Sequence, residues 1–110
     1  MPREIVLATA GPVTAIECIA AAATVDPDLG VGRLWQGGGI QIAVERELVL
    51  AVLRSTALVQ REDAERILGA SLPEDAAWLT ELYGPEGSAT TDAVVVELAG
   101  VTGATVLEPR

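Results

Sequence analysis

Three consecutive glycines, Gly37, Gly38 and Gly39, constrain the fold of this 110-residue chain more than any other feature of its sequence. Over the residues that follow, 40–45, large aliphatic side chains alternate with Gln, Ala and Glu, which is the period of a strand and not of a helix. Glycine motifs that hold dinucleotides or phosphates instead lie directly before a helix. We therefore predict a hairpin turn between this strand and one that ends at residues 34–36. The alternative is a glycine-lined surface that a ligand or a partner's backbone approaches closely.

The predicted hairpin turn also leads to predictions for two residues, Gly38 and Trp35. If the turn needs a positive φ, Gly38→Val should lower the free energy of unfolding by about 1 kcal/mol or more. Trp35 should be at least half buried beside the glycines, because a lone exposed Trp would need a partner to explain it.

A strand and a helix are predicted before the glycines. The apolar run over residues 3–9 is typical of a core strand, and the Gly-Pro pair that follows ends it. Thr14 and Glu17 have the spacing of a capping box and predict a helix to about residue 24. The start of that helix is a weak candidate for anion binding, because Pro12 lacks an N–H and no Lys or nearby Arg would assist.

The segment over residues 48–54 is apolar on both faces. This suits a central strand that is covered on two sides, or a strand that a neighbouring subunit covers. A helix over residues 43–58 also fits the spacing of the apolar residues, but the β-branched side chains favour strands.

Residues 61–68 have the pattern of a short helix that the next glycine ends. Its first turn is acidic, which complements the helix dipole. Arg61 and Glu65, and likewise Glu62 and Arg66, are four residues apart, so they predict two ion pairs on a solvated helix face.

Two later segments allow more than one structure. Local rules favour a helix over residues 72–83, since Ser71 and Glu74 repeat the capping-box spacing. Residues 77–83 are nevertheless typical of a strand, so we predict one helical turn over residues 73–76 followed by a strand. Three consecutive valines likewise favour a hairpin over residues 91–101, but cap-like residues at both ends lead us to predict a helix. A last strand then covers residues 104–107.

The assembled order indicates the α+β class, with a mainly antiparallel sheet and helices packed on one face. A ferredoxin-like arrangement is the nearest specific prediction. Residues 1–110 show no internal repeat or linker, so we expect a single domain.

Charge and missing residue types exclude several classes of function. The formal net charge is −9, which disfavours binding to nucleic acid or to an anionic membrane surface. Every basic residue is Arg and His is absent, so Ser-His, Cys-His and His-metal sites cannot form within the chain. No apolar run is long enough to span a bilayer. We predict a cytoplasmic protein without a cofactor, and the missing residue types favour a non-enzyme over an enzyme.

Neither the single cysteine nor the acidic turn predicts a reactive or metal site. Cys18 lies in an apolar stretch beside Glu17, and both features favour an inert buried thiol. Asp26 and Asp28 suggest a calcium loop, but positions six and twelve of that loop hold Val31 and Gly37 instead of Gly and Glu. An ordinary acidic turn is therefore expected, and no metal.

The first functional hypothesis is a small, acidic, non-catalytic binding protein, such as an inhibitor or an immunity-type antidote. Its acidic face would occupy a basic site on a partner protein, because opposite charge accelerates and orients association. The acidic residues considered for this face include Asp26 and Asp28 of the predicted turn. The candidate partner-binding residues are Glu45, Glu47, Glu62, Asp63 and Glu65.

Two alternatives remain open. The first is a small-ligand-binding protein or an enzyme that uses carboxylates, with Glu45, Glu47 and Glu81 as candidates near Trp78 and Tyr83. The second is a self-associating structural module, a homo-oligomer in which the apolar strand over residues 48–53 is buried by its copy.

Overall fold

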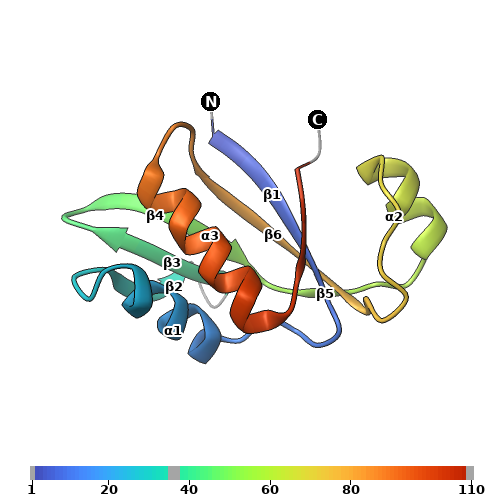
Figure 1. The fold of residues 1–110 in the computed structure, drawn as a ribbon, viewed down its shortest axis with the longest axis horizontal. Coiled ribbons are helices and arrows are strands. Elements are labelled where there is room, and N and C mark those ends of the chain that lie inside the picture. The colour runs from blue at the N-terminus through green and yellow to red at the C-terminus, as the bar shows by residue number, and fades with distance from the viewer. Residues whose placement is uncertain (1, 35–37, 109–110) are drawn as a thin grey trace.

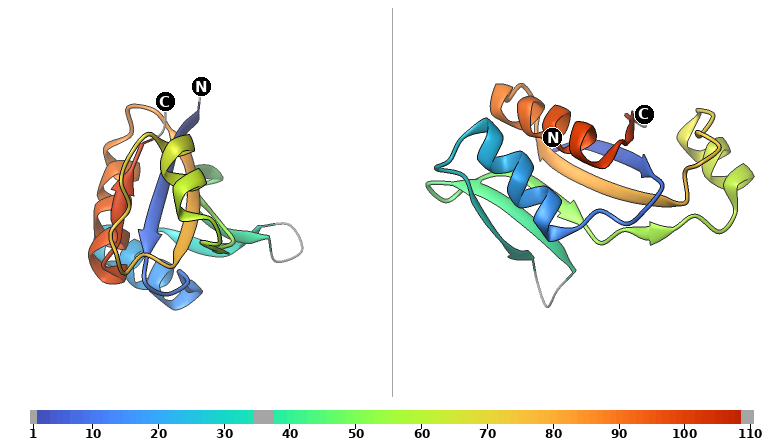
Figure 2. Two further views of the ribbon diagram at one scale, coloured as in Figure 1. Left: turned by 90° about the vertical axis from the view of Figure 1, so that its right-hand side faces the viewer. Right: turned by 60° about the horizontal axis from the view of Figure 1, so that its bottom comes forward.

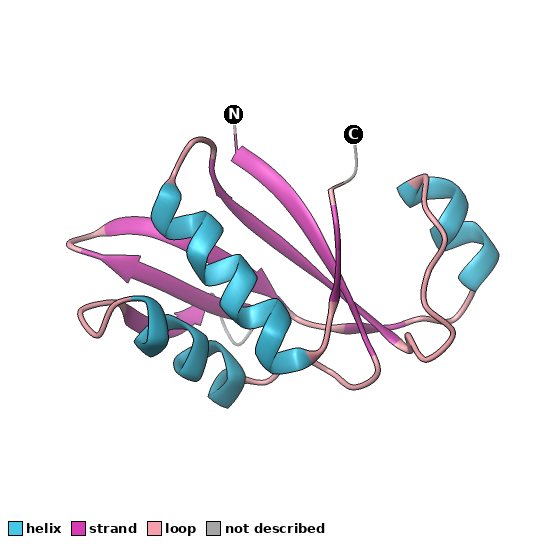
Figure 3. Cartoon of the chain, viewed as in Figure 1, coloured by secondary structure: helices cyan, strands magenta, loops and turns pink. Residues whose placement is uncertain are grey.

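The computed structural model describes residues 2–34 and 38–108 of the chain. Figure 1 shows the path of the chain, and Figure 3 separates its helices from its strands. In chain order the elements are β1 (Pro2–Thr9), α1 (Ala15–Val25), β2 (Gly30–Leu34), β3 (Gly39–Val44), β4 (Glu47–Leu53), β5 (Thr56–Ala57), α2 (Arg61–Leu68), β6 (Trp78–Pro85), α3 (Ala89–Thr102) and β7 (Thr105–Leu107).

Within the described residues, seven strands form one antiparallel sheet. The strands follow the order β2-β3-β4-β6-β1-β7, and the short β5 pairs with β6. Helices α1 and α3 lie side by side over one face of this sheet (Figures 1 and 2). The predicted α+β class is confirmed, as are the strand at 77–83 and the helix at 91–101. A ferredoxin-like arrangement, which has four strands, is not confirmed.

The core lies between this face and the two helices. Alternate residues of the strands point into it, and the helices contribute one stripe each. Its fully buried side chains are mostly aliphatic, as the absence of Phe requires: Ile5, Leu7, Cys18, Ala21, Ile42, Leu50, Leu82, Val94 and Leu98. The small Ala21 and Ala22 let α1 approach the sheet and α3 closely.

The start of α1 follows the capping box that its sequence predicts. The Glu17 N–H donates to the Thr14 hydroxyl at 3.3 Å, and the Thr14 N–H donates to the Glu17 carboxylate at 2.9 Å. Because these contacts are local, a short sequence pattern is enough to place the helix end.

Gly39 is a position at which the backbone leaves no room for a side chain. It pairs with Leu34 of β2 on one side and with Leu53 of β4 on the other. A Cβ on Gly39 would lie 2.3 Å from the carbonyl oxygen of Val52, closer than any real side chain can come. The segment after β2 therefore leads into another strand, as predicted, and Gly39 also permits a close approach of two backbones.

Other predictions for this turn are not settled. Trp35, whose burial was predicted, lies outside the described residues, as does Gly37. The expected loss of stability in Gly38→Val stays a prediction. The carbonyl oxygen of Gly38 accepts a hydrogen bond of 3.1 Å from the N–H of Arg54, which ties the turn to the end of β4.

Strand β4 takes the central place that its apolar sequence predicts. It lies between β3 and β6, and the inner side chains Leu50 and Val52 are buried under the helices. The chain itself therefore covers that side of the strand. On the other side Ala51 and Leu53 are half-buried.

The turn between β3 and β4 consists of Glu45 and Arg46. Val44 pairs with Glu47, so the loop has two residues, and φ is 49° at Glu45 and 70° at Arg46. Two positive φ values are the mark of a type I′ hairpin turn, which Asn-Gly favours and which other residues adopt at a cost. The sequence indicated only a polar break here, because the usual turn residues are missing.

Replacing this turn with Asn-Gly should stabilise the protein. We expect Glu45→Asn with Arg46→Gly to raise the free energy of unfolding by about 1 kcal/mol, because both residues adopt positive φ more easily. Urea unfolding followed by circular dichroism measures the difference. An unchanged or lower midpoint would contradict the turn geometry.

Helix α2 lies on the other side of the sheet from α1 and α3. Its Ala64 and Leu68 pack against a small buried cluster that contains Ala8 of β1, and Leu79 of β6 packs against the same cluster. These two strand residues alternate with the core residues on their strands, so they face away from the core. No residue of α2 is buried. The prediction of helices on one face thus holds for two of the three described helices.

The two ion pairs predicted on α2, Arg61–Glu65 and Glu62–Arg66, do not form. The Glu65 carboxylate instead accepts a hydrogen bond of 2.6 Å from the N–H of Leu72. The Arg61 guanidinium donates to four backbone carbonyl oxygens, those of Leu72, Pro73, Glu74 and Ala76. The loop after α2 offers these backbone groups, and satisfying them stabilises more than an exposed ion pair does.

No described helix is long and apolar enough to cross a membrane.

Candidate functional site

Two neighbouring turns at one end of the sheet carry four carboxylates. Asp26 and Asp28 lie in the turn between α1 and β2, and Glu45 and Glu47 lie at the turn between β3 and β4. The first residue of β2 pairs with Ala43, which brings the two turns together. They lie side by side in both Figure 1 and Figure 2. We call these four residues the acidic end.

The acidic end is open to solvent. Asp28, Glu45 and Glu47 are exposed, whereas the half-buried Asp26 accepts a hydrogen bond of 2.9 Å from the N–H of Asp28 and so also fixes its turn. No described Arg forms an ion pair with any of the four. Next to them the apolar residue Leu48 is 44% exposed. The surface therefore combines negative charge with one apolar contact point.

The other predicted partner-binding residues lie elsewhere. Glu62, Asp63 and Glu65 belong to α2, at the opposite end of the long axis of the molecule, which extends 41 Å (Figure 1). Asp63 lies 3.6 Å from Arg66, and Glu65 holds the loop after the helix. The structure thus brings Glu45 and Glu47 together with the two turn aspartates, but not with the acidic residues of α2.

In the alternative hypothesis, the third candidate carboxylate, Glu81, lies far from Glu45 and Glu47. Val52 pairs with Leu82, so Glu81 of β6 lies level with the end of β4, whereas Glu47 is the first residue of β4. At a rise of about 3.3 Å per residue, this puts Glu81 about 20 Å from Glu47 along the strand. Glu45 lies further away still. Glu81 therefore cannot pair with Glu45 or Glu47 for acid-base chemistry near Trp78 and Tyr83.

Glu81 does contact Tyr83, as its sequence position suggested. The Tyr83 hydroxyl donates to the Glu81 carboxylate at 3.0 Å on the outer face of the sheet. This hydrogen bond raises the pKa of Tyr83, with smaller effects from desolvation and from the charges of Glu81 and Glu4. A phenol with a raised pKa is a poorer base or nucleophile at neutral pH, so the contact favours a structural role.

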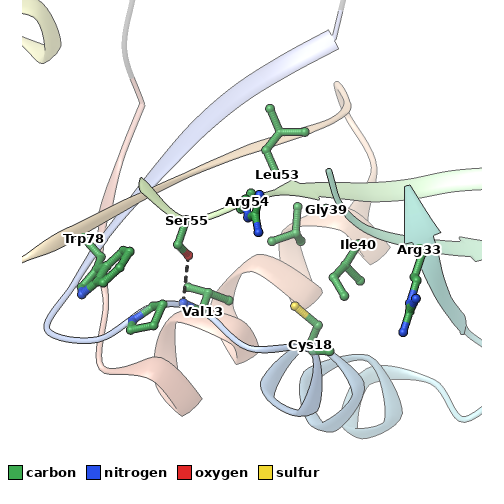
Figure 4. A pocket seen from close by; sticks show the side chains of 12 residues that line it. Val13, Cys18, Arg33, Gly39, Ile40, Leu53, Arg54, Ser55 and Trp78 are labelled. Carbon is green, nitrogen blue, oxygen red and sulfur yellow. Dashed lines mark hydrogen bonds between the residues drawn. The ribbon is translucent and has the colours of Figure 1, made fainter. Parts of the chain in front are cut away.

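A cavity of about 450 Å³ opens at the N-terminal end of α1, away from the acidic end. Figure 4 shows Arg33 and Arg54 at its wall, with Gly39 and Ile40 between them in that view, and Trp78 on the other side. The sequence indicated that no Arg lies near this helix start, and that was wrong. The two arginines come from distant positions, and the sheet brings both to the cavity.

Cys18 lines the same cavity but is fully buried. Desolvation, with a smaller effect from the charge of Glu17, raises the pKa of its thiol to about 11. The predicted burial of Cys18 is thus confirmed, and because the thiolate is the reactive form, we expect this thiol to react slowly at neutral pH. Within the described residues, no three His, Cys, Asp or Glu side chains come together as metal ligands.

The raised pKa makes Cys18 a test of the packing around it. At pH 8 the native thiol should react with iodoacetamide at least about tenfold more slowly than the same thiol in urea, because both burial and the low thiolate fraction slow the reaction. Mass spectrometry of timed samples measures both rates. Equal rates would show that Cys18 is accessible and that α1 does not pack as described.

Comparisons with known proteins do not assign the chain. No family model, no curated protein and no solved structure matches it.

Proposed function

We propose that this protein is a non-catalytic binding protein that docks a basic protein partner through its acidic end. The observation that carries the proposal is the placement of Asp26, Asp28, Glu45 and Glu47 on two adjoining turns without an arginine partner in the described chain. Like charges gathered in one place create a field that attracts and orients a basic surface, whereas scattered charges serve solubility alone.

The backbone of the second turn supports the same proposal. Glu45 and Arg46 both adopt positive φ, a conformation that Asn-Gly would adopt at lower cost. Residues kept in such conformations are often functional. A glutamate in this turn is therefore better explained by its charge than by the stability of the hairpin.

An inhibitor or immunity-type antidote fits this surface best. Such a protein needs a rigid scaffold and a charged face, and no reactive group of its own. The core under α1 and α3 supplies the scaffold, and the exposed Leu48 beside the carboxylates supplies an apolar contact that charge alone lacks. The proposed compartment is the cytoplasm, which suits an unpaired cysteine.

Capture of partners over a series of salt concentrations tests this proposal. Tagged protein is incubated with lysate of its source cells, and bound proteins are eluted stepwise from about 0.05 to 1 M NaCl. We expect a basic protein that elutes at intermediate salt, since exposed charges are screened within about 10 Å at 0.1 M. A captured set without a basic protein, or one that salt does not release, would contradict the proposal.

A further inference from the structure

We propose that the cavity at the start of α1 is a second binding site, which takes a small organic carboxylate with an apolar body. It lies at the other end of α1 from the acidic end and is independent of the basic partner. Its volume of about 450 Å³ falls within the range of small-molecule sites, which are mostly apolar with a few placed polar groups.

The charge of the cavity is opposite to that of the protein. The chain has 16 acidic residues and only 7 basic ones, yet among the described residues no Asp or Glu lines the cavity and two arginines do. Neither Arg33 nor Arg54 forms an ion pair with a described residue. By contrast, Arg3 pairs with Asp92 and Glu108, and Arg61 is held by backbone carbonyl groups. Two guanidinium groups at one cavity therefore offer unused donors to an anion.

Other polar groups at the cavity are already engaged. The Ser55 hydroxyl accepts a hydrogen bond of 2.9 Å from the N–H of Val13 (Figure 4). It also lies 2.6 Å from the Thr80 hydroxyl. The N–H groups of Thr14 and Glu17 are satisfied within the capping box. The start of the helix thus has few donors to spare, and the anion would depend on the two arginines.

The rest of the wall selects the body of the ligand. Ile40 and Val52 from the sheet, with Val13 from the loop before α1, form an apolar surface, and the Trp78 ring closes one side. A phosphate without an organic group would leave this surface uncovered and would bring a second charge that must be desolvated. A monocarboxylate with a ring or a short aliphatic chain covers it and accepts a bidentate hydrogen bond from Arg.

Titration with benzoate, benzamide and inorganic phosphate tests the proposal, with ¹H–¹⁵N correlation spectra of the whole chain as the readout. Benzamide has the shape of benzoate without its charge. We expect benzoate to shift the signals of cavity residues such as Ile40 and Ser55 in a saturable way, and to bind about tenfold or more tightly than benzamide and phosphate. Binding of all three with equal strength, saturable shifts only outside the cavity, or no saturable shift with benzoate would overturn the proposal.

Three variants show whether the arginines bind the anion. Arg33→Gln with Arg54→Gln should weaken benzoate binding about tenfold or more, because the charge-assisted hydrogen bonds are lost. Arg46→Gln, which removes an exposed arginine at the acidic end, should leave it unchanged. Spectra without benzoate confirm that each variant is folded, and Arg33→Lys with Arg54→Lys, which keeps both charges, should bind with intermediate strength. Undiminished binding in the double glutamine variant would refute the assignment.

Discussion

Gly39→Ala should lower the free energy of unfolding by about 3 kcal/mol or prevent folding altogether. The new methyl group would lie 2.3 Å from the carbonyl oxygen of Val52 and 3.0 Å from the Cα of Leu53. Both contacts are backbone atoms of a central strand, so no side chain can turn aside to make room. To admit the methyl group, β3 and β4 would have to separate where they pair.

Gly32→Ala is the matched control for this substitution. Gly32 lies in β2 of the same hairpin, and a Cβ there would meet no atom within 4 Å. Its stability should stay within about 0.5 kcal/mol of the parent protein, as at most open surface positions. Urea unfolding of both variants gives the comparison. If Gly39→Ala and Gly32→Ala unfold at the same midpoint, the close approach of β3 and β4 is not as described.

Local sequence patterns were enough for much of the fold. Thr14 and Glu17 place the start of α1, and Gly69 and Gly103 end α2 and α3 with positive φ. These signals work because the groups that satisfy one another are three or four residues apart. The alternation after Gly39 likewise identified a strand from its own side chains.

Features that depend on contacts between residues far apart in the chain could not be predicted from the sequence. Arg33 and Arg54 are 21 positions apart, and only the order of β2, β3 and β4 brings them to one cavity. The role of Arg61 depends on the path of the loop after α2, which no pattern within the helix indicates. The positive φ at Glu45 and Arg46 was missed because the residues that normally signal such a turn are absent.

The acidic set was predicted only in part for the same reason. A sequence shows how many carboxylates there are, but the side-by-side position of the α1–β2 and β3–β4 turns follows from strand pairing. That pairing places the turn of Asp28 next to the turn of Glu45. Both turns lie far from α2, which carries Glu62.

Reversing two charges at the acidic end should slow association with the basic partner about tenfold or more at low salt. Glu45→Arg with Glu47→Arg replaces attraction by repulsion where the partner first approaches, and such charges act mainly on the rate of encounter. Both residues are exposed, so the fold should be unaffected. At about 1 M NaCl, where charges are screened within about 3 Å, most of the difference should disappear.

The matched control reverses two charges on α2. Glu62→Arg with Asp63→Arg changes the formal net charge by the same amount, from −9 to −5, because each reversal adds two charges. These residues are also exposed and lie at the other end of the molecule. A difference between the two double variants therefore reports position and not total charge.

The most direct test of the acidic end is the association rate of the captured basic partner with these two double variants, measured by stopped-flow fluorescence at low and high salt. We expect Glu45→Arg/Glu47→Arg to associate about tenfold or more slowly than the parent at low salt, and Glu62→Arg/Asp63→Arg to stay within about threefold of it. Equal slowing of both variants, or an unchanged rate for Glu45→Arg/Glu47→Arg, would contradict docking through the acidic end.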